Sequence, residues 1–182
     1  MGRKATHEGT CQICGRVQRL PNGFLAKHGY KTTFGYFQGV CWGSKELPYE
    51  QSCDVLHSYV QFLNEKKIKL IQQRDAWLLP ATSPHTQIHI PRRGIWMWER
   101  CEVQQTAIGH IQIVDLTGEP ISVAYHRPDQ SKTLLENADL LNKRRADQFS
   151  IEIRHVEIEI DMATRRIANW KENQPLKELL AV

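Results

Sequence analysis

The sequence predicts an α+β protein, with a zinc-ribbon-like module at the N-terminus and two long antiparallel helices, coiled-coil-like, that have a small antiparallel sheet inserted between them. Three observations predict this class. Four of the five cysteines lie between residues 11 and 53, two long segments have apolar residues at helical spacing, and the segment between them is rich in β-branched and aromatic residues. We expect a zinc-binding module over residues 1–47 and a helical and β domain over 48–182.

The cysteine spacing is the strongest local signal in the chain. Cys11 and Cys14 form a Cys-x2-Cys pair, and Cys41 and Cys53 follow, with His28 between them. Zinc takes four ligands at the corners of a tetrahedron, and two thiolates at this spacing supply one edge from a single turn. Spacing alone leaves the second edge open among His28, Cys41 and Cys53.

Two helices and a sheet are predicted in the rest of the chain. The first helix is predicted at about residues 48–79, and Pro80 ends it. A stripe of mostly apolar residues runs along it from Leu56 to Trp77 in steps of four and three, interrupted by Lys67 and Arg74. The sheet is expected at about 85–126, where residues 117–120, Thr-Gly-Glu-Pro, are typical of a hairpin turn.

The second helix is predicted at about residues 133–171. Its apolar residues keep heptad spacing from Phe149 to Trp170, with charged residues around them. A helix of this length is too long to be buried on all sides in a chain of 182 residues. We therefore expect it to pack along the first helix or along a second copy of itself, which would make a homodimer through the C-terminal helix.

The N-terminal motif resembles a family of uncharacterised zinc-binding proteins carried by bacteria and their phages and plasmids. The resemblance covers residues 11–56, and its matching segments are Cys11-Gln-Ile-Cys14, His28-Gly29-Tyr30, the glycine-rich stretch that ends in Cys41, and Pro48-Tyr49-Glu50-x-Ser52. It implies a Cys3His site made of Cys11, Cys14, His28 and Cys41, with Cys53 as a buried thiol. The family has no established activity.

A structural zinc ion is the expected cofactor. A catalytic zinc keeps one position open for water and needs a general base beside it, whereas a closed site rich in thiolates offers neither. We expect one Zn²⁺ that the module needs in order to fold. The chain has no nucleotide-binding loop, nucleophile elbow or HExxH motif, so we predict that it is not an enzyme. Four histidines in the sheet region are a weaker indication of catalysis: His85, His89, His110 and His126.

The compartment is predicted from what the sequence lacks. The first 20 residues are polar, and no run approaches the ~18–20 apolar residues that span a bilayer. We therefore expect a cytoplasmic protein without a membrane partner. Thiols stay reduced there, and clustered cysteines bind metal more often than they form disulfides.

The sequence leaves two candidate functions, which differ in the partner that the protein binds. The net charge is +4, and the basic excess lies in residues 1–80, where Arg16, Arg19, Lys27 and Lys31 could contact phosphates. The first function is therefore a nucleic-acid-binding accessory or regulatory protein. The alternative is a mobile-element protein that binds and inhibits or modulates a host complex, such as a defence system or RNA polymerase. Trp96 and Trp98 fit either a buried strand or an exposed face that stacks on bases.

Overall fold

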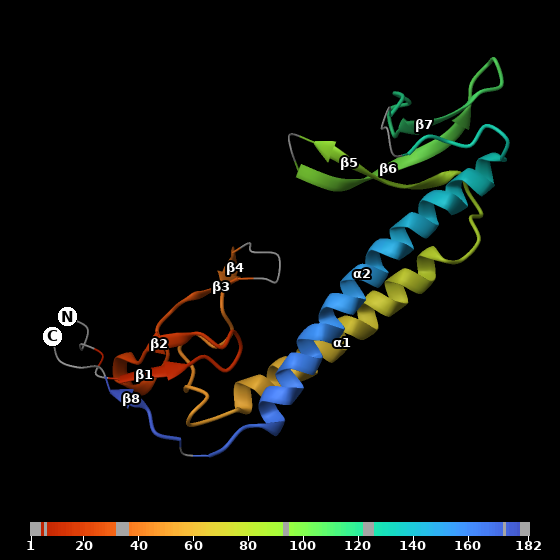
Figure 1. Cartoon of the computed structure of the whole chain (residues 1–182). Coiled ribbons are helices and arrows are strands. Elements are labelled where there is room, and N and C mark those ends of the chain that lie inside the picture. Colours follow the sequence, from red (N-terminus) through yellow and green to blue (C-terminus); the bar gives the residue numbers. More distant parts are fainter. Residues whose placement is uncertain are drawn as a thin grey trace. The chain divides into compact units, whose positions relative to one another are not determined.

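The computed structural model describes residues 5, 7–31, 37–92, 95–121, 126–172 and 174–178 (Figure 1). In chain order the elements are β1 (His7–Thr10), β2 (Val17–Arg19), the 3-10 turn Pro21–Gly23, β3 (Gly29–Lys31), β4 (Phe37–Val40), α1 (Asp54–Trp77), β5 (His85–Arg92), β6 (Ile95–Gln105), β7 (Ile111–Asp115), α2 (Leu134–Ala168) and β8 (Lys177–Glu178). The chain divides into two compact units. One combines Met1–Lys66 with Val156–Val182, and the other is Lys67–His155.

The first unit contains a sheet that joins the two ends of the described chain. Its strand order is β2-β1-β8, all antiparallel, with Glu8 of the central strand opposite Arg19 on one side and Lys177 on the other. The predicted module ended at residue 47, whereas this sheet takes its third strand from the C-terminus (Figure 1). A second, two-stranded sheet pairs β3 with β4.

The helix α1 begins at Asp54, later than the predicted start at residue 48. Residues 48–52 form a turn instead, in which the amides of Gln51 and Ser52 both donate to the carbonyl of Pro48. The Ser52 hydroxyl then accepts the amide of Asp54 at 3.1 Å. A side-chain oxygen at this position satisfies one of the amides that a helix start leaves without a partner.

The helix α2 begins at Leu134 with a capping box. The Thr133 hydroxyl accepts the amide of Glu136 at 3.2 Å, and the Glu136 carboxylate accepts the amide of Thr133 at 2.7 Å. This reciprocal pair fixes the start of the helix. The structure ends the helix at Ala168, three residues before the predicted end.

The prediction of a coiled-coil-like pair of long helices was wrong. The two helices have 24 and 35 residues, and the division between the units falls within both, after Lys66 and after His155. The residues of the stripe from Phe149 to Trp170 therefore belong to two units, and they do not form one continuous seam. Its last residue shows this, because the Trp170 indole donates to the carbonyl of Tyr49 in the cysteine-containing part of the chain.

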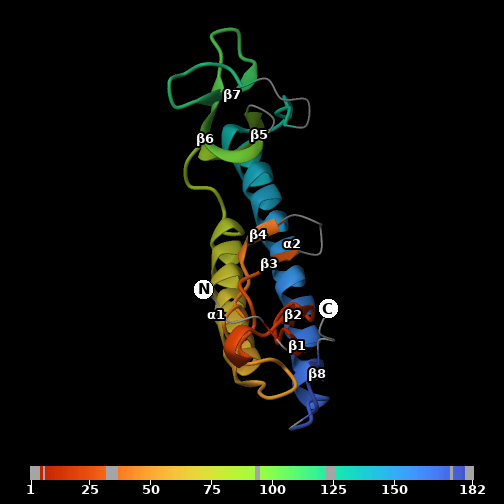
Figure 2. The same ribbon diagram turned by 90° about the vertical axis from the view of Figure 1, so that its left-hand side faces the viewer.

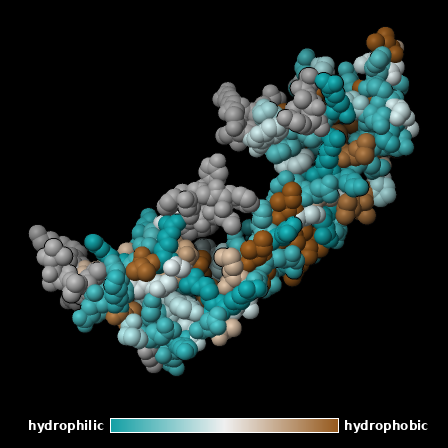
Figure 3. Space-filling view, viewed as in Figure 1, coloured by the Kyte–Doolittle hydropathy of each residue, from teal (hydrophilic) through white to brown (hydrophobic). Residues whose placement is uncertain are grey.

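Exposure along α2 distinguishes one buried face. Phe149, Ile153 and Val156 of the predicted stripe are buried, whereas Ile151 and Ile158 outside it are about half exposed. Apolar side chains are visible at the surface over the helices among polar ones (Figure 3). The heptad spacing thus indicated correctly that α2 is amphipathic, but spacing does not specify what packs on the apolar face.

The second unit is built on the antiparallel sheet β5-β6-β7, with the long strand β6 in the middle (Figure 2). Alternate residues of the sheet face a core in which Val103, opposite Ile113, packs with Ile88 and with Ala138 and Leu141 of α2. The fourth predicted strand falls largely on residues 122–125, outside the described residues. The predicted hairpin turn is present, since the Asp115 carboxylate accepts the amides of Thr117 and Glu119 at 2.8 and 3.0 Å.

Adjacent leucines of α2 test this account of the second core. Leu141 is 5% exposed in the core, whereas Leu140 is 40% exposed. We expect Leu141→Ala to lower the free energy of unfolding by about 2–5 kcal/mol, because a cavity remains where a buried side chain is removed. Leu140→Ala should cost less than about 1 kcal/mol. Urea denaturation measures both, and equal losses would contradict the assigned helix face.

Candidate metal centre

Four side chains in the first unit come together as a group that could hold a metal ion. They are Cys11, Cys14, His28 and Cys41, and their ligand atoms all lie within 4.8 Å of one another. Cys11 and Cys41 are buried, and Cys14 and His28 are half-buried. The residues come from two turns and one loop, so the chain must fold three separated segments onto one point.

The first turn follows β1 and presents two thiols. The carbonyl of Cys11 accepts the amide of Gly15 at 3.0 Å, and the amide of Cys11 donates to the carbonyl of Arg16 at 2.8 Å. Gly15 has φ = 71°, in the left-handed region that favours glycine. The turn therefore closes tightly enough to place both sulfurs of the Cys-x2-Cys pair on one side.

The second turn follows β4 and presents Cys41. Its amide donates to the carbonyl of His28 at 2.9 Å, which ties this turn to the histidine loop. The Ser44 hydroxyl reinforces the tie by donating to the same carbonyl at 3.0 Å. Gly43 in this turn lies directly against the site, because a Cβ there would overlap the sulfur of Cys11.

His28 has its ring nitrogens in distinct environments. Nδ1 lies 2.8 Å from the carbonyl oxygen of Ala26, and a carbonyl can only accept, so Nδ1 carries the hydrogen. Nε2 then has its lone pair available and lies 3.4 Å from the sulfur of Cys14. Metal-binding histidines usually donate their other N–H to a carbonyl or carboxylate in this way, which fixes both tautomer and ring orientation.

Two distances in the group match the edges of a zinc tetrahedron. Bonds of about 2.3 Å to sulfur and about 2.0 Å to nitrogen place two sulfurs about 3.8 Å apart and a sulfur and a nitrogen about 3.5 Å apart. The sulfurs of Cys11 and Cys41 are 3.7 Å apart, and the Cys14 sulfur and His28 Nε2 are 3.4 Å apart. All five cysteines are free thiols.

The thiols of the group differ in acidity. The hydrogen bond with Cys41, together with burial, raises the pKa of Cys11 to about 12, and burial raises the pKa of Cys14. The same contact from Cys11 lowers the pKa of Cys41. The hydrogen bond thus favours the thiol form of Cys11 and the thiolate form of Cys41, and neighbouring thiolates would repel one another. A cation among them would remove that repulsion, since metal ligation requires the thiolates.

The other two cysteines are not part of this group. Cys53 is buried, its carbonyl accepts the amides of Leu56 and His57 at the start of α1, and burial raises the pKa of its thiol. Cys101 lies in the core of the second unit, where burial raises its pKa to about 12. The residues brought together are therefore those that the resemblance implied, whereas spacing alone did not choose between His28 and Cys53.

Gln12 ties the first turn to α1, and nothing in the sequence indicated its role. Its side chain is completely buried. The amide nitrogen donates to the carbonyl of Leu47 at 2.9 Å, and the amide oxygen accepts the N–H of Leu56 at 3.2 Å. Gln12 thus satisfies an amide in the first turn of α1.

Arg166 of α2 contacts the same turn from another direction. Its guanidinium donates to the carbonyls of Cys11 and Ile13 at 2.9 and 3.1 Å, and it lies 4.9 Å from the centre of the Tyr49 ring. The Tyr49 hydroxyl donates to the carbonyl of Arg166. The turn that presents the thiols is therefore held by Arg166, a side chain more than 150 positions away in sequence.

Glu50, a carboxylate close to the cysteines in sequence, is engaged with the backbone. Both of its oxygens accept the amide of Thr10, at 3.0 and 2.9 Å. Its observed role is to fasten the end of β1 to the segment before α1.

The basic residues predicted to contact phosphates lie around this centre. Arg19 in β2 and Lys27 are exposed, and the amide of Ala26 donates to the carbonyl of Arg19 at 2.9 Å, so their segments are adjacent. Arg16 is half-buried. The backbone of Lys31 belongs to β3, but its side chain lies outside the described residues.

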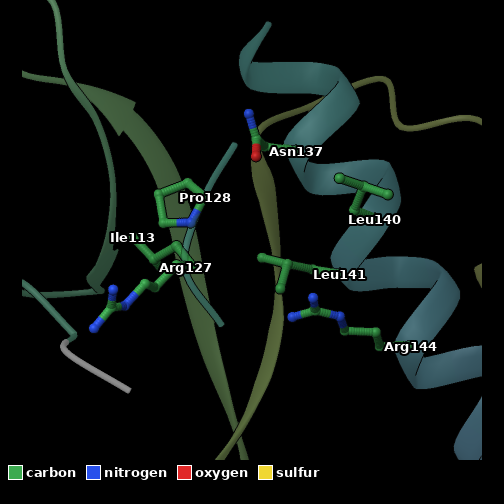
Figure 4. Close-up of a pocket in the computed structure, with 7 residues that line it drawn as sticks. All are labelled: Ile113, Arg127, Pro128, Asn137, Leu140, Leu141 and Arg144. Atoms are coloured by element: carbon green, nitrogen blue, oxygen red, sulfur yellow. The ribbon is translucent and has the colours of Figure 1, made fainter. Parts of the chain in front are cut away.

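A small pocket in the second unit lies between α2 and the segment around β7 (Figure 4). It is lined by Ile113, Pro128 and Leu141 and by the side chains of Arg127 and Arg144. Its cavity volume is about 20 Å³, which is room for about one water molecule. This pocket is too small for an organic substrate.

The sheet histidines do not form a second metal group among the described residues. His85 lies 4.0 Å from Glu102, and His110 is exposed. His126 Nε2 lies 3.1 Å from the carbonyl oxygen of His89.

Comparisons with known proteins add no relative. No family model, no curated protein and no solved structure matches the chain. None of the described helices is both long enough and apolar enough to cross a bilayer.

Gly43 supplies a test of the geometry of the centre. We expect Gly43→Ala to abolish stoichiometric metal binding, because the new methyl group would occupy the position of the Cys11 sulfur. Gly39→Ala is the control. It strains a backbone with φ = 65°, but a Cβ there meets nothing within 4 Å, so we expect some loss of stability with the metal retained. Metal analysis after gel filtration reads out both, and full metal content in Gly43→Ala would refute the geometry.

Proposed function

We propose that Cys11, Cys14, His28 and Cys41 hold one structural Zn²⁺ in a closed tetrahedral site. The observation that supports this most strongly is the agreement of the two edge distances, 3.7 and 3.4 Å, with zinc–sulfur and zinc–nitrogen bonds. Three thiolates and one imidazole are also a typical structural zinc set, whereas carboxylate or carbonyl oxygens would suit Mg²⁺ or Ca²⁺.

The proposed role is structural because the protein itself occupies all four ligand positions. A site that activates water needs an open position. In the first unit, the metal would replace a larger core. Among the described residues, the buried apolar ones clustered with the site are Leu20 and Leu25, with Ile13 and Leu176 packed against them. Metal binding would then contribute directly to the free energy of folding.

A matched pair of serine variants tests the ligand set. We expect Cys14→Ser to lose the bound zinc and most of the stability of the first unit, because one thiolate ligand is removed. Cys53→Ser should keep one zinc per chain, since Cys53 lies outside the group. Native mass spectrometry counts the metal in each variant. Zinc loss in Cys53→Ser with retention in Cys14→Ser would reverse the assignment.

We also propose that the protein is a nucleic-acid-binding accessory or regulatory factor of the cytoplasm. The exposed side chains of Arg19 and Lys27 support this, because they extend from adjacent segments that the zinc site would hold together. Two cations at fixed positions can contact successive phosphates and release counterions. We also propose, from the resemblance described above, that the protein belongs to a phage or plasmid.

The salt dependence of binding tests this function. We expect Arg19→Ala with Lys27→Ala to weaken binding of a duplex probe and to reduce the slope of log K against log salt by about 2, because two phosphate contacts are lost. Lys66→Ala with Lys69→Ala, which removes two exposed lysines from α1, should leave the slope unchanged. Fluorescence anisotropy at several salt concentrations measures both, and identical slopes would rule out this surface.

A protein partner, such as a host defence complex or RNA polymerase, is the second candidate, and one observation favours it. Trp42, next to Cys41, is 48% exposed and lies against Phe62 of α1, which is 42% exposed. Exposed tryptophans are enriched at the centres of protein interfaces. Capture of one host protein that resists high salt and is lost in Trp42→Ala would favour this candidate.

A further inference from the structure

An aromatic ladder lies on one face of the sheet in the second unit. His89 is directly opposite Trp98 across β5 and β6, and their rings stack with centroids 4.8 Å apart and planes at 17°. The centre of the Trp96 ring lies 5.2 Å from that of His89, with the planes tilted at 42°. Residues two apart on a strand share a face, so Trp96, Trp98 and Arg100 of β6 point the same way, away from the core that Cys101 and Val103 form.

An arginine of α2 completes this ladder. The guanidinium carbon of Arg145 lies 4.2 Å from the centre of the Trp98 ring and 4.5 Å from that of Phe149. Its Nε is buried and has no hydrogen-bond partner among the described residues. The two rings therefore pack against this cation, and a buried N–H without a partner is a feature that needs an explanation.

The charge around the ladder is positive. Arg144 is exposed and donates to Nδ1 of His126 at 2.9 Å, while Nε2 of His126 lies 3.1 Å from the carbonyl oxygen of His89. Burial and the charge of Arg144 lower the pKa of His126, so this histidine adds no charge of its own at neutral pH. Arg100 is exposed on the same face as the tryptophans, and Glu152 is the acid whose charge acts on Arg145.

Exposure distinguishes this ladder from a buried aromatic core. Trp98 is half-buried, but 51% of Trp96 is accessible to solvent. Exposed aromatic rings beside arginines fit a ligand that has flat rings along an anionic chain, because bases stack on the rings and phosphates meet the cations. A duplex keeps its bases stacked inside, so a single strand is the form that offers them.

We propose that this face binds single-stranded nucleic acid, with one base stacked on Trp96 beside His89 and the neighbouring phosphate on Arg144. The inference rests on the proposed function only in that the partner is a nucleic acid. The surface proposed here lies in the second unit and binds a single strand. The phosphate contacts of Arg19 and Lys27 lie in the first unit and are tested with a duplex.

The experiment measures anisotropy of three labelled probes of equal length with the full chain: a single-stranded oligonucleotide, its abasic counterpart with the same phosphates, and a duplex. We expect the single strand to bind at least about tenfold more tightly than the abasic strand. Trp96→Ala should weaken single-strand binding about five- to 150-fold, the range for loss of one stacked base, and leave abasic binding unchanged. Trp96→Phe should retain most of the affinity.

Phe24→Ala is the matched control, because it removes an aromatic side chain of similar exposure, 47%, from the first unit. We expect it to bind all three probes as the unmodified chain does. Equal affinity for the normal and abasic strands would overturn the inference, as would equal losses in Trp96→Ala and Phe24→Ala, or no binding to any probe. Binding that depends on Arg19 and Lys27 but not on bases would leave the proposed function intact and reject this inference alone.

Discussion

The first unit depends on the convergence of three sulfurs and one imidazole nitrogen within 4.8 Å. Buried thiols at such distances repel one another as thiolates, and as thiols they gain little from weak S–H contacts. The backbone around them also needs glycine at two positions. Gly15 adopts a left-handed conformation, and Gly43 leaves no room for a side chain beside Cys11. A bound cation would explain why the chain accepts these constraints.

The same centre determines where the helices of this unit are attached. Gln12 connects the first cysteine turn to the N-terminus of α1, and Arg166 connects it to the C-terminal part of α2. Tyr49 and Trp170 add two hydrogen bonds between the segment before α1 and the end of α2. Metal binding at the turn would therefore order both helix ends, so the proposed zinc ion would stabilise more of the chain than its ligands.

The sequence predicted the local parts of this arrangement. Cys-x2-Cys and the glycine after it form one turn, so their geometry follows from neighbouring residues. The choice between His28 and Cys53 was different, because it depends on how the β3–β4 segment and the start of α1 pack on that turn. Arg166 contacts residues more than 150 positions away, and β8 pairs with β1 across almost the whole chain, so neither leaves a local pattern.

The helices show the same limit. The apolar stripe of α2 predicted an amphipathic helix, and the proline-rich segment after α1 ended that helix near the expected place. The stripe did not reveal that α2 divides its contacts between two units, since heptad spacing describes a face and not its neighbour. Trp96 is a second example, because its alternation with apolar residues fitted either a core or a surface. Its exposure of 51% favours a surface.

X-ray absorption spectroscopy of the purified full chain is the most direct test of the central claim. We expect a zinc edge whose fine structure fits three sulfurs at about 2.3 Å and one nitrogen at about 2.0 Å, without an oxygen ligand. Four sulfurs would mean that Cys53 replaces His28. An oxygen in the first coordination sphere would mean an open site, and the absence of any bound metal would contradict the account altogether.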